Sequence, residues 1–253
     1  MKGRKFTSPI FILMMIVLSG LLLSGCTTST NTTDTNGKRS PKNLNVVRST
    51  FTDSRDGNTY KTVEIEGQIW MAENLQFDSG CTQVVYEEYW DGGWCGCPGS
   101  YMSYEPDPSM CSKYGLLYQW SAMMTWDGWG YPPAEGIQGV CPNGWRVPTD
   151  SDWKTLELAI GLEDVDTTDW RGDVASSLWS TEYGGDNTTS FSALPAGSRL
   201  TDGMYQGEGN HTSFWTSSEV DGLGWSRLIK TDEQSIERNM ITFAAAQSVR
   251  CVR

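Results

Sequence analysis

The sequence is short of histidine and of positive charge. It has one histidine, His211, and 19 Lys and Arg against 31 Asp and Glu in 253 residues. A single imidazole excludes His-Cys zinc fingers, HExxH metalloprotease sites and catalysis that needs two histidines. A net charge of -12 leaves too few cations for a large basic face, so we do not expect nucleic acid as a partner.

Long apolar runs are absent beyond the N-terminus. There, three cations in the first five residues precede an apolar run from Ile10 to Leu18, which is short for a membrane span. Leu23-Ser24-Gly25-Cys26 follows. This order resembles the lipobox of bacterial lipoproteins, which implies cleavage before Cys26 and acylation of its thiol. The alternative is an ordinary signal peptide with a chance cysteine.

The lipobox resemblance implies a domain organisation and a location. Residues 1–25 are a lipoprotein signal peptide, 26–45 a flexible tether rich in Ser, Thr and Asn, and 46–253 the folded domain, with the aromatic residues to build one core. The partner of the lipid on Cys26 is a membrane. We expect the protein at the bacterial cell envelope, exported and lipid-anchored at the outer membrane or cell surface.

The other six cysteines predict up to three disulfides, because an even number in an exported chain is typical of a disulfide framework. Fifteen pairings are possible. We favour Cys141–Cys251, since closing that long loop removes on the order of 4–5 kcal/mol of unfolded-state entropy. Cys97–Cys111 and Cys81–Cys95 are favoured as local bridges. With no histidine nearby, a metal site at these cysteines is the weaker interpretation, and we predict none.

Apolar patterns predict the elements of the first half of the domain. Apolar residues on both sides of Glu66-Gly67 predict a hairpin between Tyr60 and Trp70. Residues 78–108 are rich in Gly, Cys, Tyr and Trp without helical period, and predict a long loop held by disulfides. Apolar positions between Lys113 and Met124 fit one face of a helix.

The second half begins with a helix signal and continues with short strands. Thr149 or Asp150 can cap a helix that ends near Gly161. Four later segments predict strands, at 191–195, 214–218, 225–229 and 248–252. Two main helices with short antiparallel strands and long disulfide-pinned loops predict an α+β domain.

Six sequence blocks resemble the Fibrobacter succinogenes major paralogous domain, a family of exported bacterial domains. They occur in the family's order and cover roughly residues 55–253. The blocks are 69–75, 111–120, 141–153, 191–199, 214–219 and 248–253, among them Ile-Trp-Met-Ala-Glu-Asn-Leu at 69–75 and Phe-Trp-Thr-Ser-Ser-Glu at 214–219. This resemblance implies no particular biochemical activity.

The segment from Trp145 to Trp153 is also similar to the motif that enters a helix in formylglycine-generating-enzyme-like and C-type-lectin-like folds. Such folds tie a helix-bearing region to the last strand by a disulfide, in agreement with Cys141–Cys251. The resemblance does not extend to either family's site. The close cysteines, Cys95 and Cys97, lie in the wrong part of the chain for the enzymes, and Glu105-Pro106-Asp107 matches the calcium motif of the lectins only in part.

Aromatic residues predict where a ligand binds. Trp70, Trp120, Trp145, Trp153 and Trp215 lie in the family blocks, and we interpret them as core residues. The candidates for ligand contact lie among Gly and Pro or in the disulfide loop. They are Trp126, Asp127, Trp129, Tyr131, Trp90 and Trp94.

These observations favour a membrane-anchored lipoprotein with a non-catalytic binding or adhesion domain, facing polysaccharide or a surface protein. One alternative is a secreted glycan hydrolase with paired carboxylates from Glu182, Asp186, Glu219 or Asp221. Another is a purely structural envelope protein. We predict no cofactor; calcium at Asp164, Asp166 and Asp169 is the one candidate, although the spacing is not that of an EF-hand. His211 is interpreted as an exposed loop residue, because no nucleophile elbow accompanies it.

Overall fold

The computed structural model describes residues 44–80, 94–100, 102–128 and 130–253. The described part is mixed α+β, with few helices and mostly antiparallel strands. Three strands form a small antiparallel sheet, and nine strands form a larger one. No helix in these ranges is both long enough and apolar enough to cross a membrane.

The small sheet is built on the predicted hairpin. Strand β2 (Thr59–Ile65) pairs with β3 (Gln68–Met71) and, on its other edge, with β1 (Val47–Thr52). Glu66 and Gly67 between β2 and β3 both have positive φ, 49° and 78°. Two such residues form the tight turn whose twist matches that of the flanking strands, which explains the register Ile65↔Gln68.

The larger sheet has the order β4-β5-β12-β7-β9-β10-β11-β6, with β8 paired to β7. Its long strands, β9 to β11, form an antiparallel meander, whereas β9 runs parallel to β7 and β12. The strand bounds are β4 (Cys95–Gly96), β5 (Leu117–Gln119), β6 (Asp169–Arg171), β7 (Ala196–Arg199), β8 (Tyr205–Glu208), β9 (His211–Val220), β10 (Leu223–Lys230), β11 (Ile236–Thr242) and β12 (Ala246–Ser248).

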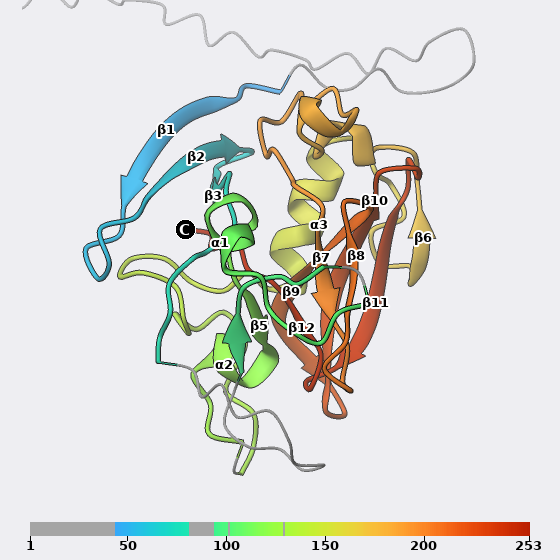
Figure 1. The fold of residues 1–253 in the computed structure, drawn as a ribbon. Coiled ribbons are helices and arrows are strands. Elements are labelled where there is room, and N and C mark those ends of the chain that lie inside the picture. Colours follow the sequence, from blue (N-terminus) through green and yellow to red (C-terminus); the bar gives the residue numbers. More distant parts are fainter. Residues whose placement is uncertain (1–43, 81–93, 101, 129) are drawn as a thin grey trace, which may run out of the picture.

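Helix α3 (Asp150–Ala159) packs between the two sheets, as Figure 1 shows. Thr149 caps it as predicted: its hydroxyl accepts a hydrogen bond from the Asp152 amide, and the Asp152 carboxylate accepts one from the Thr149 amide. On the inner face, the Trp153 ring lies 5.2 Å from Trp70 of β3 and 5.4 Å from Phe214 of β9. One buried aromatic cluster therefore joins the helix to both sheets. Two 3-10 turns, η1 (Ala175–Ser177) and η2 (Thr181–Tyr183), follow later in the chain.

The predicted helix between Lys113 and Met124 is wrong as a continuous element. The chain forms α1 (Pro108–Tyr114), then β5, then the five-residue α2 (Trp120–Met124). Gly115 ends α1 with a φ of 75°, and a side chain there would meet Asn74 and Leu75 at 2.7 to 2.9 Å. Residues 117–119 instead pair with β12. Pairing in the sheet satisfies their backbone N–H and C=O groups as fully as a helix would, so helical spacing of the apolar residues does not decide the structure.

The predicted strand at 191–195 is also wrong. Ser190 and Ser192 have φ of 57° and 56°, which breaks an extended backbone. Only Ala193 forms an isolated bridge, to Trp179, and the strand begins at Ala196. The segments predicted at 214–218 and 225–229 lie within β9 and β10.

Two of the predicted disulfides are present, Cys97–Cys111 and Cys141–Cys251. Cys95 is also disulfide-bonded. Cys81 lies outside the described residues, so its pairing with Cys95 stays a prediction. The Cys141–Cys251 bridge is buried in the core. It fixes the C-terminal segment, in which Val252 bridges both Trp70 and Arg146.

The tryptophans interpreted as core residues are all buried. Trp70, Trp120 and Trp215 have no exposed surface, and Trp145 and Trp153 are at most 3% exposed. Two large clusters hold them, one around Trp120 and Trp215 and one around Trp70 and Trp153. A third, small cluster consists of Trp94, Leu117, Tyr205 and Ala246, and it forms one wall of the site described next.

Candidate functional site

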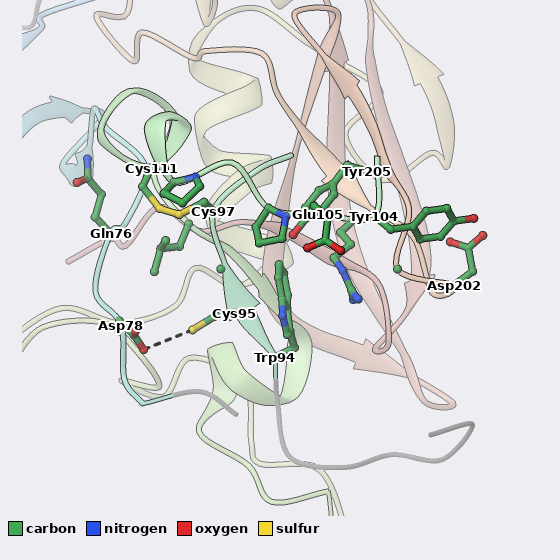
Figure 2. A pocket seen from close by; sticks show the side chains of 16 residues that line it. Gln76, Asp78, Trp94, Cys95, Cys97, Tyr104, Glu105, Cys111, Asp202 and Tyr205 are labelled. Carbon is green, nitrogen blue, oxygen red and sulfur yellow. Dashed lines mark hydrogen bonds between the residues drawn. A yellow bond between two sulfur atoms is a disulfide. The ribbon is translucent and has the colours of Figure 1, made fainter. Parts of the chain in front are cut away.

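A pocket of about 570 Å³ opens beside β4, at the edge of the larger sheet (Figure 2). Four separate stretches of chain line it: the end of the segment after β3, the region of β4, the chain from the approach to α1 through to the residues just after that helix, and the segment from the end of β7 to the start of β8. The lining residues are Gln76, Asp78, Trp94, Cys95, Gly96, Cys97, Tyr104, Glu105, Pro106, Pro108, Cys111, Leu116, Arg199, Asp202, Gly203 and Tyr205.

The approach to α1 is fixed to the rest of the pocket by local chemistry. The Cys97–Cys111 disulfide ties β4 to the helix. Asp107 caps α1 by accepting hydrogen bonds from the amide and hydroxyl of Ser109 at 2.9 and 2.7 Å. Backbone hydrogen bonds join Tyr205 to Met102 and Ser103 at 2.8 and 2.7 Å. The pocket wall is thus held by the sheet on one side and by a covalent bridge on the other.

Aromatic side chains form the inner surface. Trp94 is 6% and Tyr205 1% exposed, with ring centres 6.3 Å apart. Gly99 lets the backbone pack directly against Tyr205, because a Cβ at this position would lie 2.4 Å from the Tyr205 ring. Tyr104 is 58% exposed, and Figure 2 shows it at the same end of the pocket as Asp202. Burial raises the pKa of Tyr205 to about 12, so its phenol is a hydrogen-bond donor at neutral pH.

One cation lines the pocket. Arg199 lies at the end of β7, held in register with Tyr205 of β8 and Ala246 of β12. It is 7% exposed, and its guanidinium carbon is 4.5 Å from the centre of the Trp94 ring. Burial lowers the pKa of Arg199, and this effect outweighs the opposing influence of Tyr205 and Asp202. The guanidinium nevertheless stays charged at neutral pH.

Carboxylates surround the mouth of the pocket. Asp78, Glu105 and Asp202 are exposed lining residues. Asp78 accepts a hydrogen bond from the Gly80 amide, and Asp202 accepts one from the Met204 amide, at 2.8 and 2.9 Å. These two carboxylates stabilise turns and remain in water. Glu105 and Pro106 line the pocket, whereas Asp107 of the same tripeptide is the helix cap.

The structure separates the ligand-contact candidates. Trp94 lines the pocket, and Tyr131, 96% exposed, does not. Trp126 is half-buried, with its ring edge-on to Trp120 and Phe243. Asp127 beside it is exposed. Trp90 and Trp129 lie outside the described residues. The ring of Trp126 therefore contributes to the core, and its role in ligand contact stays a prediction.

The candidate catalytic acids are engaged elsewhere. Glu182 forms an ion pair with Lys113 at 3.2 Å, Asp186 accepts a hydrogen bond from Ser176 at 2.7 Å, and Glu219 accepts one from the Gly222 amide at 3.2 Å. Asp221 lies in the turn between β9 and β10 with a φ of 51°. None of them is a lining residue of the pocket.

His211 is not the exposed loop residue that the sequence suggested. It begins β9, half-buried, with Nε2 3.3 Å from the Ser198 hydroxyl. Burial lowers its pKa to about 4, and Lys230 contributes in the same direction. The glycine-rich sequence around it hides a strand, since Gly207 leaves room for the imidazole where a Cβ would lie 1.9 Å from it.

The candidate calcium ligands are not brought together. Asp166 forms an ion pair with Lys154 at 2.7 Å, and Asp164 and Asp169 are exposed. Within the described ranges, no three His, Cys, Asp or Glu side chains are grouped as a metal site.

Sequence reasoning missed most of the pocket. Arg199, Tyr205, Tyr104 and Glu105 come from two stretches about one hundred residues apart, and nothing in their local spacing links them. The available indication is Arg199 itself, an arginine that ends a run of small and apolar residues, Ala-Leu-Pro-Ala-Gly-Ser. Such a cation needs a partner wherever the run is buried.

Comparison with known proteins gives one result. No curated protein and no solved structure matches the chain significantly. The family model described as Fibrobacter succinogenes major domain matches residues 63–253. The match includes α3, both described disulfides and every strand of the larger sheet. The chain therefore belongs to the Fibrobacter succinogenes major domain family.

Proposed function

We propose that the domain is a non-catalytic binding module for polysaccharide, and that the pocket at Trp94 is its binding site. The observation that carries this proposal is the combination of aromatic surface and donors in one preformed cavity. Sugar rings have apolar C–H faces and polar rims, so they are recognised by stacking together with hydrogen bonds. Tyr104 supplies an exposed ring for stacking, and Trp94 supplies part of the apolar wall against which Arg199 is held. Tyr205 and Arg199 supply the hydrogen-bond donors. A cavity of about 570 Å³ is in the range of small-ligand pockets.

The fold we propose for the domain is C-type-lectin-like or formylglycine-generating-enzyme-like. Three features support it: the helix α3 that follows the Trp-Arg-Val-Pro segment, the antiparallel meander β9–β11, and the disulfide from Cys141 to Cys251 near the C-terminus. This proposal implies no calcium site and no reactive cysteine pair. A solved structure of the chain, compared with both fold families, tests it.

The binding proposal predicts loss of polysaccharide affinity on substitution at the pocket. The full chain in detergent is titrated with a panel of bacterial and plant polysaccharides, with tryptophan fluorescence and calorimetry as readouts. We expect Trp94→Ala to weaken binding by roughly tenfold or more, since stacking and anchor contacts of aromatic residues are worth about 1–3 kcal/mol. Tyr104→Ala, which removes an exposed ring, should weaken binding without altering the melting temperature.

Tyr131→Ala is the matched control, because it removes another exposed tyrosine, which lies outside the pocket. If Tyr131→Ala abolishes binding and Tyr104→Ala does not, the site is the loop at 126–131 and the pocket proposal is wrong. If no polysaccharide of the panel binds, the function shifts to a protein partner or to the structural envelope role. Turnover of any glycan would favour the hydrolase alternative.

We also propose that lipid on Cys26 anchors the protein at the cell envelope. Residues 26–45 then act as a flexible tether that lets the domain move away from the membrane surface. The tether itself has almost no apolar residues to insert into a bilayer, whereas several acyl chains on one cysteine hold a domain there. An acidic domain is repelled by anionic head groups, which leaves the lipid as the attachment.

Expression in a bacterium with labelled palmitate tests the anchor. We expect Cys26→Ser to abolish labelling and to release the domain from the membrane fraction. Ser24→Ala preserves a small residue before the cysteine and should leave both unchanged. Membrane-bound, unlabelled wild-type protein would show that the cysteine is incidental.

A further inference from the structure

We propose that the pocket selects sugars that carry a carboxylate, with Arg199 as the residue that binds it. This inference rests on the proposed function and specifies its ligand class as uronate-containing glycans. It begins from a difference among the buried arginines of the described chain in the partners that their guanidinium groups have.

Five arginines are at most 7% exposed in the described ranges. Three of them, Arg171, Arg227 and Arg238, form ion pairs with carboxylates of α3. Arg250 donates hydrogen bonds to the side-chain oxygen of Asn74 and to two backbone carbonyls. Each of these four guanidinium groups has acceptors from the folded chain, as the cost of burying an unpaired charge requires, although the Nε atom of Arg171 is left without one.

Arg199 is the exception among these five. It forms no ion pair with a carboxylate of the described residues. Its guanidinium lies over the Trp94 ring and is hydrogen-bonded to the Tyr205 phenol, and Asp202 is near enough to favour its charged form. Stacking on an indole stabilises the cation without using any of the five N–H donors of the guanidinium, and the Tyr205 phenol engages only part of them. Because the side chain lines the pocket, an acceptor that enters the pocket reaches donors that the protein leaves available.

The geometry favours a planar carboxylate as this acceptor. The guanidinium carbon of Arg199 lies 4.5 Å from the centre of the Trp94 ring, and the fork of N–H donors on a guanidinium matches the two oxygens of a carboxylate. Two neighbouring strands hold Arg199 by backbone pairing, so little additional ordering is needed on binding.

The three rim carboxylates limit how much negative charge the ligand can carry. Asp78, Glu105 and Asp202 are exposed and screened by water, whereas Arg199 acts at short range in a less polar site. One carboxylate per ring gains the arginine contact at small cost. A densely sulfated chain would place further charges against the rim.

The test compares one sugar chain with and without its carboxylates. The full chain in detergent is titrated by calorimetry with oligomers of galacturonic acid, and with the same oligomers after reduction of the carboxyl groups to alcohols. We expect the acidic oligomer to bind roughly ten- to a hundredfold more tightly, the effect of a charge-assisted hydrogen-bonded pair. Arg199→Met, which keeps the apolar stem, should remove this difference.

Arg253→Gln is the control, because Arg253 also stacks on a tryptophan, at 4.8 Å from Trp145, outside the pocket. It should leave the ratio unchanged. Equal affinity of wild type for both oligomers would overturn the carboxylate inference and leave polysaccharide binding standing. Binding of neither oligomer would also overturn the carboxylate inference, and the polysaccharide panel would then decide the proposed function by itself. Tighter binding of a sulfated glycan than of the uronate would overturn the ligand class. The wild-type ratio decides the question even if Arg199→Met does not fold.

Discussion

Replacing Cys141 and Cys251 together by alanine should lower the free energy of unfolding by about 5 kcal/mol in the chain-entropy description of a disulfide. The bridge spans 110 residues, and its reduction lets the unfolded chain explore all conformations that a closed loop excludes. The bond is also buried, and in the segment that it holds the carbonyls of Val249, Cys251 and Arg253 accept backbone hydrogen bonds from amides in and just after β3. We expect a domain that is largely unfolded at 37 °C.

Cys97→Ala with Cys111→Ala is the matched comparison, since it also removes one buried or half-buried bridge. Its sequence separation is 14, for which the same entropy argument gives about 3 kcal/mol. Chemical denaturation of both double variants, followed by tryptophan fluorescence, measures the difference. Equal losses, or a larger loss from the short bridge, would show that local strain and packing outweigh loop closure.

The parts of the fold that were predictable are those that depend on local chemistry. The Glu66-Gly67 turn fixes the hairpin, and the Thr149 cap fixes the start of α3. Cys141–Cys251 follows from loop length. The tryptophans of the family blocks are buried because no other site on a folded domain accommodates that much apolar surface.

What could not be predicted depends on contacts distant in sequence. The apolar stripe at 113–124 has helical spacing, yet Leu117 belongs to a strand because β12 lies beside it. A single sequence cannot distinguish these outcomes. The pocket also depends on distant contacts. Trp94 was predicted as a ligand residue from the composition of its loop, but Arg199 lies beside it only because the pairing of β7 with β12 in the sheet places it there.

The charged residues also include positions whose role depends on contacts distant in sequence. Glu157 looks like an ordinary polar position of α3, and it has no exposed surface. Its Oε1 accepts hydrogen bonds from Arg227 Nε at 2.6 Å and Arg171 Nη2 at 2.8 Å, and its Oε2 accepts one from Arg171 Nη1 at 3.1 Å. Arg171 comes from edge strand β6 and Arg227 from β10, so one carboxylate ties the helix to two strands of the larger sheet.

Glu157→Gln should therefore destabilise the domain by about 3–5 kcal/mol, although it changes hardly any volume. The substitution leaves two guanidinium groups buried against a neutral amide, and removing one partner of a buried pair has a cost of this size. Arg171 is affected most, since its remaining acceptor is the Val165 carbonyl, whereas Arg227 keeps Asp150 at 2.9 Å. Urea denaturation of the variant measures the loss.

Two comparisons separate charge from packing. Glu182→Gln breaks the exposed pair with Lys113 and should cost less than about 1 kcal/mol. The triple variant Glu157→Leu, Arg171→Leu and Arg227→Leu removes all three buried charges, so it should be less destabilised than Glu157→Gln alone. If Glu157→Gln is as mild as Glu182→Gln, water or backbone oxygens replace the carboxylate. If the triple variant is the worst of the three, the pairs hold α3 on the sheet through their geometry, and the buried charge itself is not the source of the instability.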